Sequence, residues 1–145
     1  MRNYKEHLIK SGTTIRNALE VLERLSNDAI LFIVNDIDKL IGSLTDGDVR
    51  RGLINGVELD QPVDDIIQLN PKFLRKGDRD IQTVISYRDS GFKIIPILNK
   101  QNKIVNVINF GKLKSYLPID VVVMAGGKGV RLRPLTENTP KPLLT

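Results

Sequence analysis

The sequence predicts an α/β fold made of two copies of one strand-and-helix unit, and three observations lead to this class. Within residues 13–44, an amphipathic helical pattern is followed by a continuous apolar run, a polar turn and a second apolar run. The same order returns within residues 77–108. Residues 118–145 follow neither copy and contain a glycine-rich loop. Self-similarity of this kind indicates two similar structural units and a separate third segment.

The first copy begins with a helix predicted at residues 15–25, where Thr13 or Thr14 can cap the start. Residues 29–34 are apolar, β-branched or aromatic throughout, which is typical of a strand buried on both faces. A polar turn then leads into residues 40–44, which predict the returning arm of a hairpin. Residues 45–56 predict a short helix that ends at a glycine.

The second copy follows the same plan 64 positions later along the hairpin. Residues 77–90 predict a helix, residues 93–98 a buried strand and residues 104–108 the returning arm, with a short helix at 113–117. Between the copies, residues 60–67 predict a linker with a single helical turn. Residues 119–124 predict a further strand that lies outside the repeat and leads into the glycine-rich loop.

Composition excludes several classes of function. With 41% hydrophobic and 27% charged residues, the 145-residue chain has the balance of a soluble globular protein. The net charge of +5 is dispersed among acids, so nucleic-acid binding is not expected. The absence of cysteine excludes disulfides and thiolate metal sites. The N-terminus lacks the apolar core of a signal peptide, and apolar runs at 29–34 and 121–125 are too short to cross a bilayer. These features predict a cytoplasmic protein with no membrane partner.

The returning arm of the first hairpin contains a glycine, which is followed by a threonine three residues later and an aspartate three residues after that. Together with the next two residues, this pattern resembles the CBS (cystathionine β-synthase-type) domain pair. The residues that carry the resemblance are Gly42, Thr45, Asp48, Val49 and Arg50. The resemblance covers about the first 117 residues. It implies CBS repeats at 1–58 and 59–117, each a β-α-β-β-α unit, packed sheet to sheet. It also implies AMP, ADP or ATP as a regulatory ligand in a cleft between the repeats. A homodimer is implied through helical faces at or near four residues: Val21, Leu22, Val84 and Ile85.

The residues around Thr45 offer chemistry that suits a nucleotide. Thr45 leaves a strand where a helix begins, so its hydroxyl and the free N–H groups that follow can meet a phosphate, and Gly47 leaves room for it. Asp48 can accept hydrogen bonds from ribose hydroxyls, and Arg50 or Arg51 can neutralise phosphate charge. The alternative is structural: Thr45 or Asp46 caps the helix, Asp48 complements its dipole and the arginines are solvated. The sequence leaves both open.

The second copy departs from the family pattern at the corresponding positions. Asn106 stands in place of the glycine, Asn109 in place of the threonine and Lys112 in place of the aspartate. A lysine cannot accept hydrogen bonds from ribose hydroxyls. We therefore expect the cleft built on Thr45 and Asp48 to bind ligand and the second cleft to be weak or empty.

Residues 118–145 contain a second motif, at 124–136 and 140–144, which resembles the opening signature of sugar-1-phosphate nucleotidyltransferases. The resemblance implies that the backbone at Gly126, Gly127 and Gly129 closes on an NTP triphosphate. Arg131 and Lys141 would supply positive charge to the reacting phosphates in the intact parent enzyme. Val130 stands where a threonine is commoner in that family.

We do not expect catalysis from these 145 residues. The sequence stops at Thr145, before the sugar pocket and before the acidic residues with which that family holds Mg²⁺, so we expect no metal site in this fragment. Three functions stay open. The chain is a regulatory, adenine-nucleotide-sensing module of a sugar-phosphate nucleotidyltransferase; or the full-length protein is a catalytic nucleotidyltransferase that uses an NTP and Mg²⁺; or the module is a ligand-free dimerisation spacer.

Overall fold

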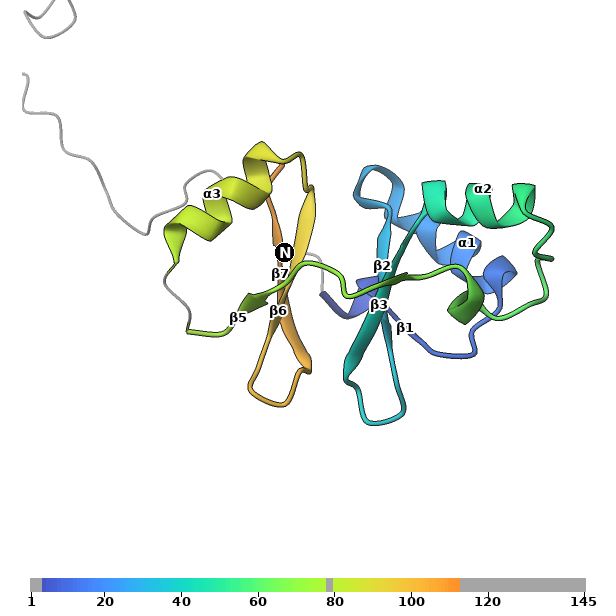
Figure 1. Ribbon diagram of the computed structural model, residues 1–145, viewed down its shortest axis with the longest axis horizontal. Helices are drawn as coiled ribbons and strands as arrows, with labels where there is room; N and C mark the ends of the chain where they lie inside the picture. The colour runs from blue at the N-terminus through green and yellow to red at the C-terminus, as the bar shows by residue number, and fades with distance from the viewer. Residues whose placement is uncertain (1–3, 78–79, 113–145) are drawn as a thin grey trace, which may run out of the picture. The chain divides into compact units, whose positions relative to one another are not determined.

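The computed structural model describes residues 4–77 and 80–112, which form two β-sheets flanked by helices (Figure 1). The first repeat contains two strands of a hairpin, a short third strand and two α-helices, in the order η1 (Tyr4–His7), β1 (Leu8–Lys10), α1 (Ile15–Leu25), η2 (Ser26–Asp28), β2 (Ile30–Val34), β3 (Leu40–Thr45) and α2 (Asp46–Ile54). The predicted helix, strand, hairpin and second helix of this copy are therefore confirmed.

The linker and the second repeat follow the same plan in shorter form. Their elements are η3 (Val63–Asp65), β4 (Gln68–Leu69), β5 (Leu74–Arg75), α3 (Ile81–Asp89), β6 (Ile94–Leu98) and β7 (Ile104–Asn109). The predicted helix, buried strand and returning arm are confirmed here too. The expected helix at 113–117, the strand at 119–124 and the glycine-rich loop all lie outside the described residues.

The two sheets repeat one pattern of strand pairing. In the first sheet, of order β1-β2-β3-β4, β1 runs parallel to β2 and the hairpin β2–β3 is antiparallel. In the second, of order β5-β6-β7, β5 runs parallel to β6 and the hairpin β6–β7 is antiparallel. The register shifts at the same place in both hairpins, between Ile33 and Val34 and between Ile97 and Leu98. The internal repeat read from the sequence is thus a repeat of structure.

The linker contributes the strand β4 to the first sheet, and β4 precedes all strands of the second sheet in the sequence. β4 pairs antiparallel with β3, aligning Gln68 with Ser43 and Leu69 with Gly42. Val63, fully buried, belongs to the core of the first repeat. The strands β1, β4 and β5 have only two or three residues each, which is too few for an alternating pattern to be read from the sequence.

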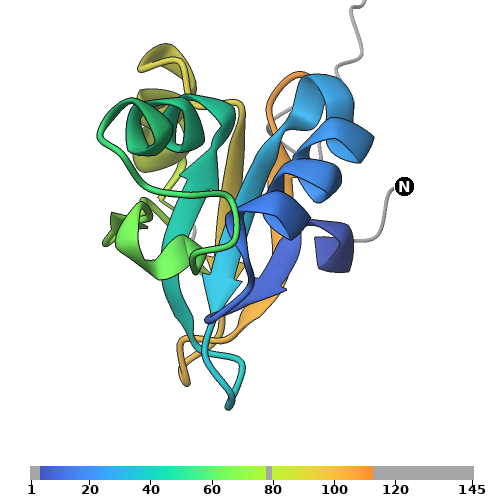
Figure 2. The same ribbon diagram turned by 90° about the vertical axis from the view of Figure 1, so that its right-hand side faces the viewer.

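The inner faces of the two sheets pack against each other, as Figures 1 and 2 show from two sides. This shared core contains Phe32 and Val34 from β2, Ile94 and Leu98 from β6 and Ile104 from β7. Because β2 and β6 also carry helices on their outer faces, they are buried on both sides, which explains their continuous apolar sequences. The predicted sheet-to-sheet packing is confirmed.

The helices cover the outer faces and complete two further cores. Thr14 caps α1 as predicted, and the apolar face of α1 packs against the first sheet with Val49 of α2. α3, capped by Asp80, packs Val84 and Tyr87 against the second sheet. Leu22 is 3% exposed and belongs to the inner core of the first repeat. The expectation that Leu22 contributes to a dimer surface is therefore wrong, because its side chain points inward.

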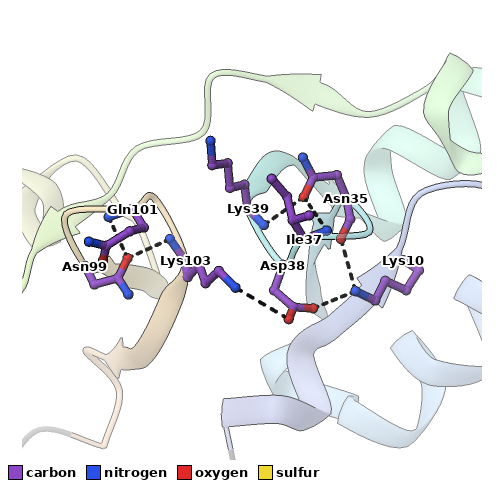
Figure 3. A network of polar contacts seen from close by, with 8 residues as sticks. All are labelled: Lys10, Asn35, Ile37, Asp38, Lys39, Asn99, Gln101 and Lys103. Carbon is purple, nitrogen blue, oxygen red and sulfur yellow. Dashed lines mark hydrogen bonds and ion pairs between the residues drawn. The ribbon is translucent and has the colours of Figure 1, made fainter.

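The tips of the two hairpins meet through matching polar turns (Figure 3). The Oδ1 atom of Asn35 accepts hydrogen bonds from the backbone N–H groups of Ile37 and Lys39, and Asn99 does the same for Gln101 and Lys103. Lys39 and Lys103 pair as an antiparallel bridge between the repeats.

One carboxylate joins these turns to each other. Asp38 accepts from Lys10 Nζ at 2.5 Å, and Lys103 Nζ lies 4.0 Å from its other oxygen (Figure 3). The backbone N–H of Leu40 also donates to Asn102 O at 3.0 Å. Asp38 and its counterpart Asn102 both adopt the left-handed conformation that these two residue types tolerate best, with φ of 63° and 62°. The repeats are thereby fixed at the hairpin tips.

Candidate functional site

A cleft of about 720 Å³ opens between the two repeats, at the ends of the hairpins opposite the tips. The first repeat contributes its η2 helix, the start of β2 and the junction of β3 with α2. The second contributes the segment that leads into β6, and the linker runs along one side. The lining residues named below are Asp28, Thr45, Asp48, Gln68, Leu69, Lys72, Phe92 and Lys93.

Thr45 and Asp48 line this cleft together and form a reciprocal cap at the start of α2. The Asp48 N–H points to Thr45 Oγ1 at 3.4 Å, while the Thr45 N–H donates to Asp48 Oδ2 at 2.8 Å. The Thr45 hydroxyl donates to the same carboxylate oxygen at 2.6 Å. This is the pattern of a capping box, in which strand end and helix start hold each other.

Two further donors complete the surroundings of Asp48. Arg51 Nη2 and Gln68 Nε2 both donate to Asp48 Oδ1, at 2.6 and 2.9 Å. The Asp48 side chain is only 3% exposed. Burial raises the pKa of Asp48, but the hydrogen bonds from Thr45, Gln68 and Arg51 outweigh burial, so the pKa lies below its ordinary value. Asp48 is thus an ionised carboxylate whose four acceptor positions are filled.

The other predicted residues of this site lie apart from the cleft. Arg50 donates to Asp46 at 2.5 Å on the surface of α2, where its side chain is 72% exposed. Neither Arg50 nor Gly47 is among the lining residues. The structure therefore brings Thr45 and Asp48 together at the cleft, and it places Arg51 against Asp48.

The sequence alone did not reveal the cleft-lining residues of the linker and of the segment that leads into β6. Gln68, Lys72, Phe92 and Lys93 come from segments 23 to 48 residues away from Thr45 in the chain, and they carry no motif of their own. One signal was available for Phe92, because it lies 64 positions after Asp28 in the other copy. Folding two matched copies face to face places the start of each buried strand beside the partner repeat.

At the corresponding positions of the second repeat, Asn109 and Lys112 bind a carboxylate of the first repeat. Asn109 Nδ2 donates to Asp28 Oδ1 at 2.9 Å, and Lys112 Nζ donates to Asp28 Oδ2. Burial raises the pKa of Asp28, but the hydrogen bonds from Lys112 and Asn109 outweigh burial and lower it below its ordinary value. The residues that replace the threonine and the aspartate therefore bind a carboxylate of the first repeat.

His7 contacts the backbone of the first sheet and does not line the cleft. Its side chain is buried, and Nδ1 lies 2.9 Å from Ile30 O at the start of β2. Within residues 4–77 and 80–112, no group of three or more His, Cys, Asp or Glu side chains could hold a metal ion. The helices in that part of the chain include none long and apolar enough to span a membrane.

Comparison with known proteins decides the fold family. The CBS domain model matches residues 5–55. A CBS domain protein from Pyrobaculum aerophilum complexed with AMP superposes with a TM-score of 0.58 at 16% identity, covering 70% of this chain and 78% of that one. The described chain folds as a tandem pair of CBS domains.

Other structures with this fold were solved with different ligands. The CBS pair resembles one in complex with 5′-methylthioadenosine and S-adenosyl-L-methionine, with a TM-score of 0.57 at 19% identity, covering 70% of this chain and 79% of that one. It also resembles the cytosolic domain of the Mg²⁺ channel MgtE in complex with ATP, with a TM-score of 0.57 at 21% identity, covering 72% and 42%. These identities show a shared fold.

Sequence comparisons add a second family match and two relatives. The Nucleotidyl transferase model matches residues 120–145. An uncharacterized protein of Helicobacter pylori is 32% identical over 108 residues, covering 73% of this chain and 32% of that protein. One of Chlamydia trachomatis is 30% identical over 95 residues, covering 63% and 28%. The chain therefore spans about a third of the length of the curated relatives it matches.

Proposed function

We propose that this CBS pair is a regulatory module that binds an adenine nucleotide in the cleft lined by Thr45 and Asp48. The observation that carries the proposal is the cleft itself. Its volume of about 720 Å³ falls within the range of about 300–1,000 Å³ typical of small-molecule sites, and it lies between the two repeats. AMP and ATP in structures of the same fold support an adenine nucleotide as the ligand.

The polar contacts support different roles for Thr45 and Asp48. The Thr45 hydroxyl lies at the cleft wall and is half-buried, so a ligand can reach it. Asp48 is saturated, and a ribose hydroxyl can bind its carboxylate only by displacing one of four existing donors. Gln68 is the donor most easily displaced, because its residue is exposed and its amide can hydrogen-bond water or ligand instead. Once Gln68 has moved away, Asp48 still accepts both hydrogen bonds from Thr45 and so holds Thr45 at the wall of the cleft.

The divergence of the two repeats supports a single ligand per pair. In the second repeat Asn109 and Lys112 already bind the Asp28 carboxylate. A ligand at Asn109 and Lys112 would have to break that ion pair, whereas Thr45 is half-buried at the wall of the open cleft. We expect one nucleotide to bind to each chain.

Isothermal titration calorimetry with AMP, ADP and ATP tests this function. The Thr45→Ala variant should bind the nucleotide about tenfold more weakly, because it loses a hydroxyl contact. Thr14→Ala is the matched control, since Thr14 also caps a helix but does not line the cleft. Absence of binding by the wild-type chain, with an unchanged melting temperature, would instead support a ligand-free dimerisation spacer.

For the intact protein, we propose that the ligand regulates a sugar-phosphate nucleotidyltransferase domain that begins at residue 118. The match of the Nucleotidyl transferase model to residues 120–145 supports this second activity. Arg131 and Lys141, with the glycines at 126, 127 and 129, would contact the NTP; all lie outside the described residues. Mg²⁺ binding and homodimer formation belong to the same proposal.

The intact protein allows a direct test of the proposed activity. Pyrophosphate release from an NTP and a sugar 1-phosphate should be detectable, and Lys141→Ala should abolish it without changing nucleotide binding to the CBS pair. Coupling requires that the regulatory nucleotide changes the release rate, because an effector acts only through different affinities for two states. An unchanged rate at saturating AMP and ATP would contradict the regulatory role.

A further inference from the structure

The charges around the cleft are unevenly compensated. Among its described lining residues, the charged side chains are Asp28, Asp48, Lys72 and Lys93. Both carboxylates are neutralised from outside the lining, Asp28 by Lys112 and Asp48 by Arg51. The ammonium groups of Lys72 and Lys93 make no ion pair or hydrogen bond with any described residue. The uncompensated charge of the described cleft is therefore positive.

The two lysines approach the cleft from different segments. Lys72 follows β4 in the linker, and Lys93 precedes β6 in the second repeat. Each has an exposed apolar neighbour that also lines the cleft, Leu69 at 70% exposure and Phe92 at 39%. The Phe92 ring is held edge-on against Tyr87 at 5.7 Å. The same cleft thus offers apolar surface for a base and cations for a charged group.

This combination bears on which adenosine derivatives can bind. AMP and ATP carry dianionic or more highly charged phosphates at neutral pH, adenosine is neutral, and S-adenosylmethionine carries a net positive charge. Solved relatives of the same fold are complexed with ligands of each charge type, so the fold alone does not choose among them. The unpaired side chains of the cleft do distinguish them, because two cations attract an anion and repel a sulfonium.

From these contacts we infer that Lys72 and Lys93 are charge-selecting residues, which make the cleft specific for phosphorylated adenosine and exclude S-adenosylmethionine. The inference rests on the proposed nucleotide function and adds the chemical class of its ligand. Both lysines are exposed, so each contact with phosphate is partly screened by solvent. Each contributes about fivefold to affinity, and together about 25-fold if their effects are independent.

The experiment compares AMP, adenosine and S-adenosylmethionine on five forms of the 145-residue chain. These are wild type, Lys72→Gln with Lys93→Gln, each single variant and the control Lys100→Gln. Lys100 lies in the β6–β7 turn and does not line the cleft. Calorimetry measures AMP binding, and competition against AMP measures the other two ligands.

We expect wild type to bind AMP at least tenfold more tightly than adenosine, and S-adenosylmethionine no more tightly than adenosine. The double variant should bind AMP about as weakly as adenosine, and Lys100→Gln should behave as wild type. Raising NaCl from 50 to 500 mM should weaken AMP binding to wild type but leave adenosine binding unchanged.

Three results would overturn the inference, and they are distinguishable from one another. Equal binding of AMP and adenosine, unaffected by either cleft lysine, would refute charge selection and leave the nucleotide function standing. Failure of every adenosine derivative to bind wild type would refute both. An equal loss of AMP affinity in Lys100→Gln would also refute it, because the effect would then belong to the surface charge as a whole.

Discussion

Replacing Asp48 by alanine removes the carboxylate on which the junction of β3 and α2 depends. Thr45 donates two hydrogen bonds to it from a half-buried position, through its N–H and its hydroxyl. Hydrogen bonds to a charged group contribute about 1.5–3 kcal/mol each to stability. Gln68 and Arg51 are exposed, so water replaces their bonds to Asp48 and their loss costs little. We expect the free energy of unfolding to fall by about 3 kcal/mol.

Thr14→Ala provides the comparison for this prediction. It also removes a helix cap, but the bond it loses, from the Asn17 N–H to Thr14 Oγ1, is long at 3.3 Å. A weak cap of this kind contributes about 0.5 kcal/mol. Asp48→Asn, which keeps an acceptor but loses the charge, should fall between the two.

Urea unfolding followed by circular dichroism measures these differences. A change in the midpoint at constant slope reports stability rather than a change in the unfolded state. If Asp48→Ala proved no more destabilising than Thr14→Ala, the four bonds to Asp48 would carry no more stability than an ordinary cap. The interpretation of Asp48 as the residue that organises the cleft wall would then be wrong.

Two further predictions concern packing and pH. Gly42→Ala should lower the free energy of unfolding by about 1–2 kcal/mol, because the new Cβ would lie 2.7 Å from Ile67 Cδ1 and 3.1 Å from Gln68 O. Gly47→Ala is the control and should stay within about 0.5 kcal/mol of wild type, because the atom nearest to its new Cβ is Arg51 Nη1 at 3.4 Å, which can move away. Equal effects of the two substitutions in urea unfolding would contradict this prediction. Because the pKa values of Asp48 and Asp28 are lowered in the folded state, their contribution to stability is complete above the unfolded-state pKa of about 3.9 and is lost as the pH falls through the lower folded-state values. Unfolding midpoints between pH 6 and pH 2 should show this acid loss, and Asp28→Asn should reduce it; a flat profile would refute it.

The main elements of the fold could be predicted because local physics decides them. The helix at 15–25 shows its apolar face in the spacing of its residues, and the hairpin strands show their two-sided burial as continuous apolar runs. Since both signals recur 64 positions apart, the sequence also predicted two matched units. β1, β4 and β5 gave no such signal, because strands this short are stabilised by neighbours that are distant in the chain.

In the candidate site, too, the features set by neighbouring residues could be predicted and those set by distant segments could not. Thr45 and Asp48 could be found from the sequence, because a capping pair is a local pattern with a spacing of three residues. Their hydrogen-bond state could not, since Gln68 reaches Asp48 from 20 residues away. The dimer-surface role of Leu22 was mistaken because an apolar face looks the same in sequence whether it packs inward or outward.

The sequence by itself determined that two copies exist, where their buried strands lie and that the second copy has lost the threonine and the aspartate. Only the tertiary structure decided what the residues in their places, Asn109 and Lys112, bind. It placed Asp28 of one repeat against Asn109 and Lys112 of the other, and left Lys72 and Lys93 unpaired among the described residues of the open cleft. The physical reason is that charge compensation depends on distances between segments, and folding alone brings those segments together.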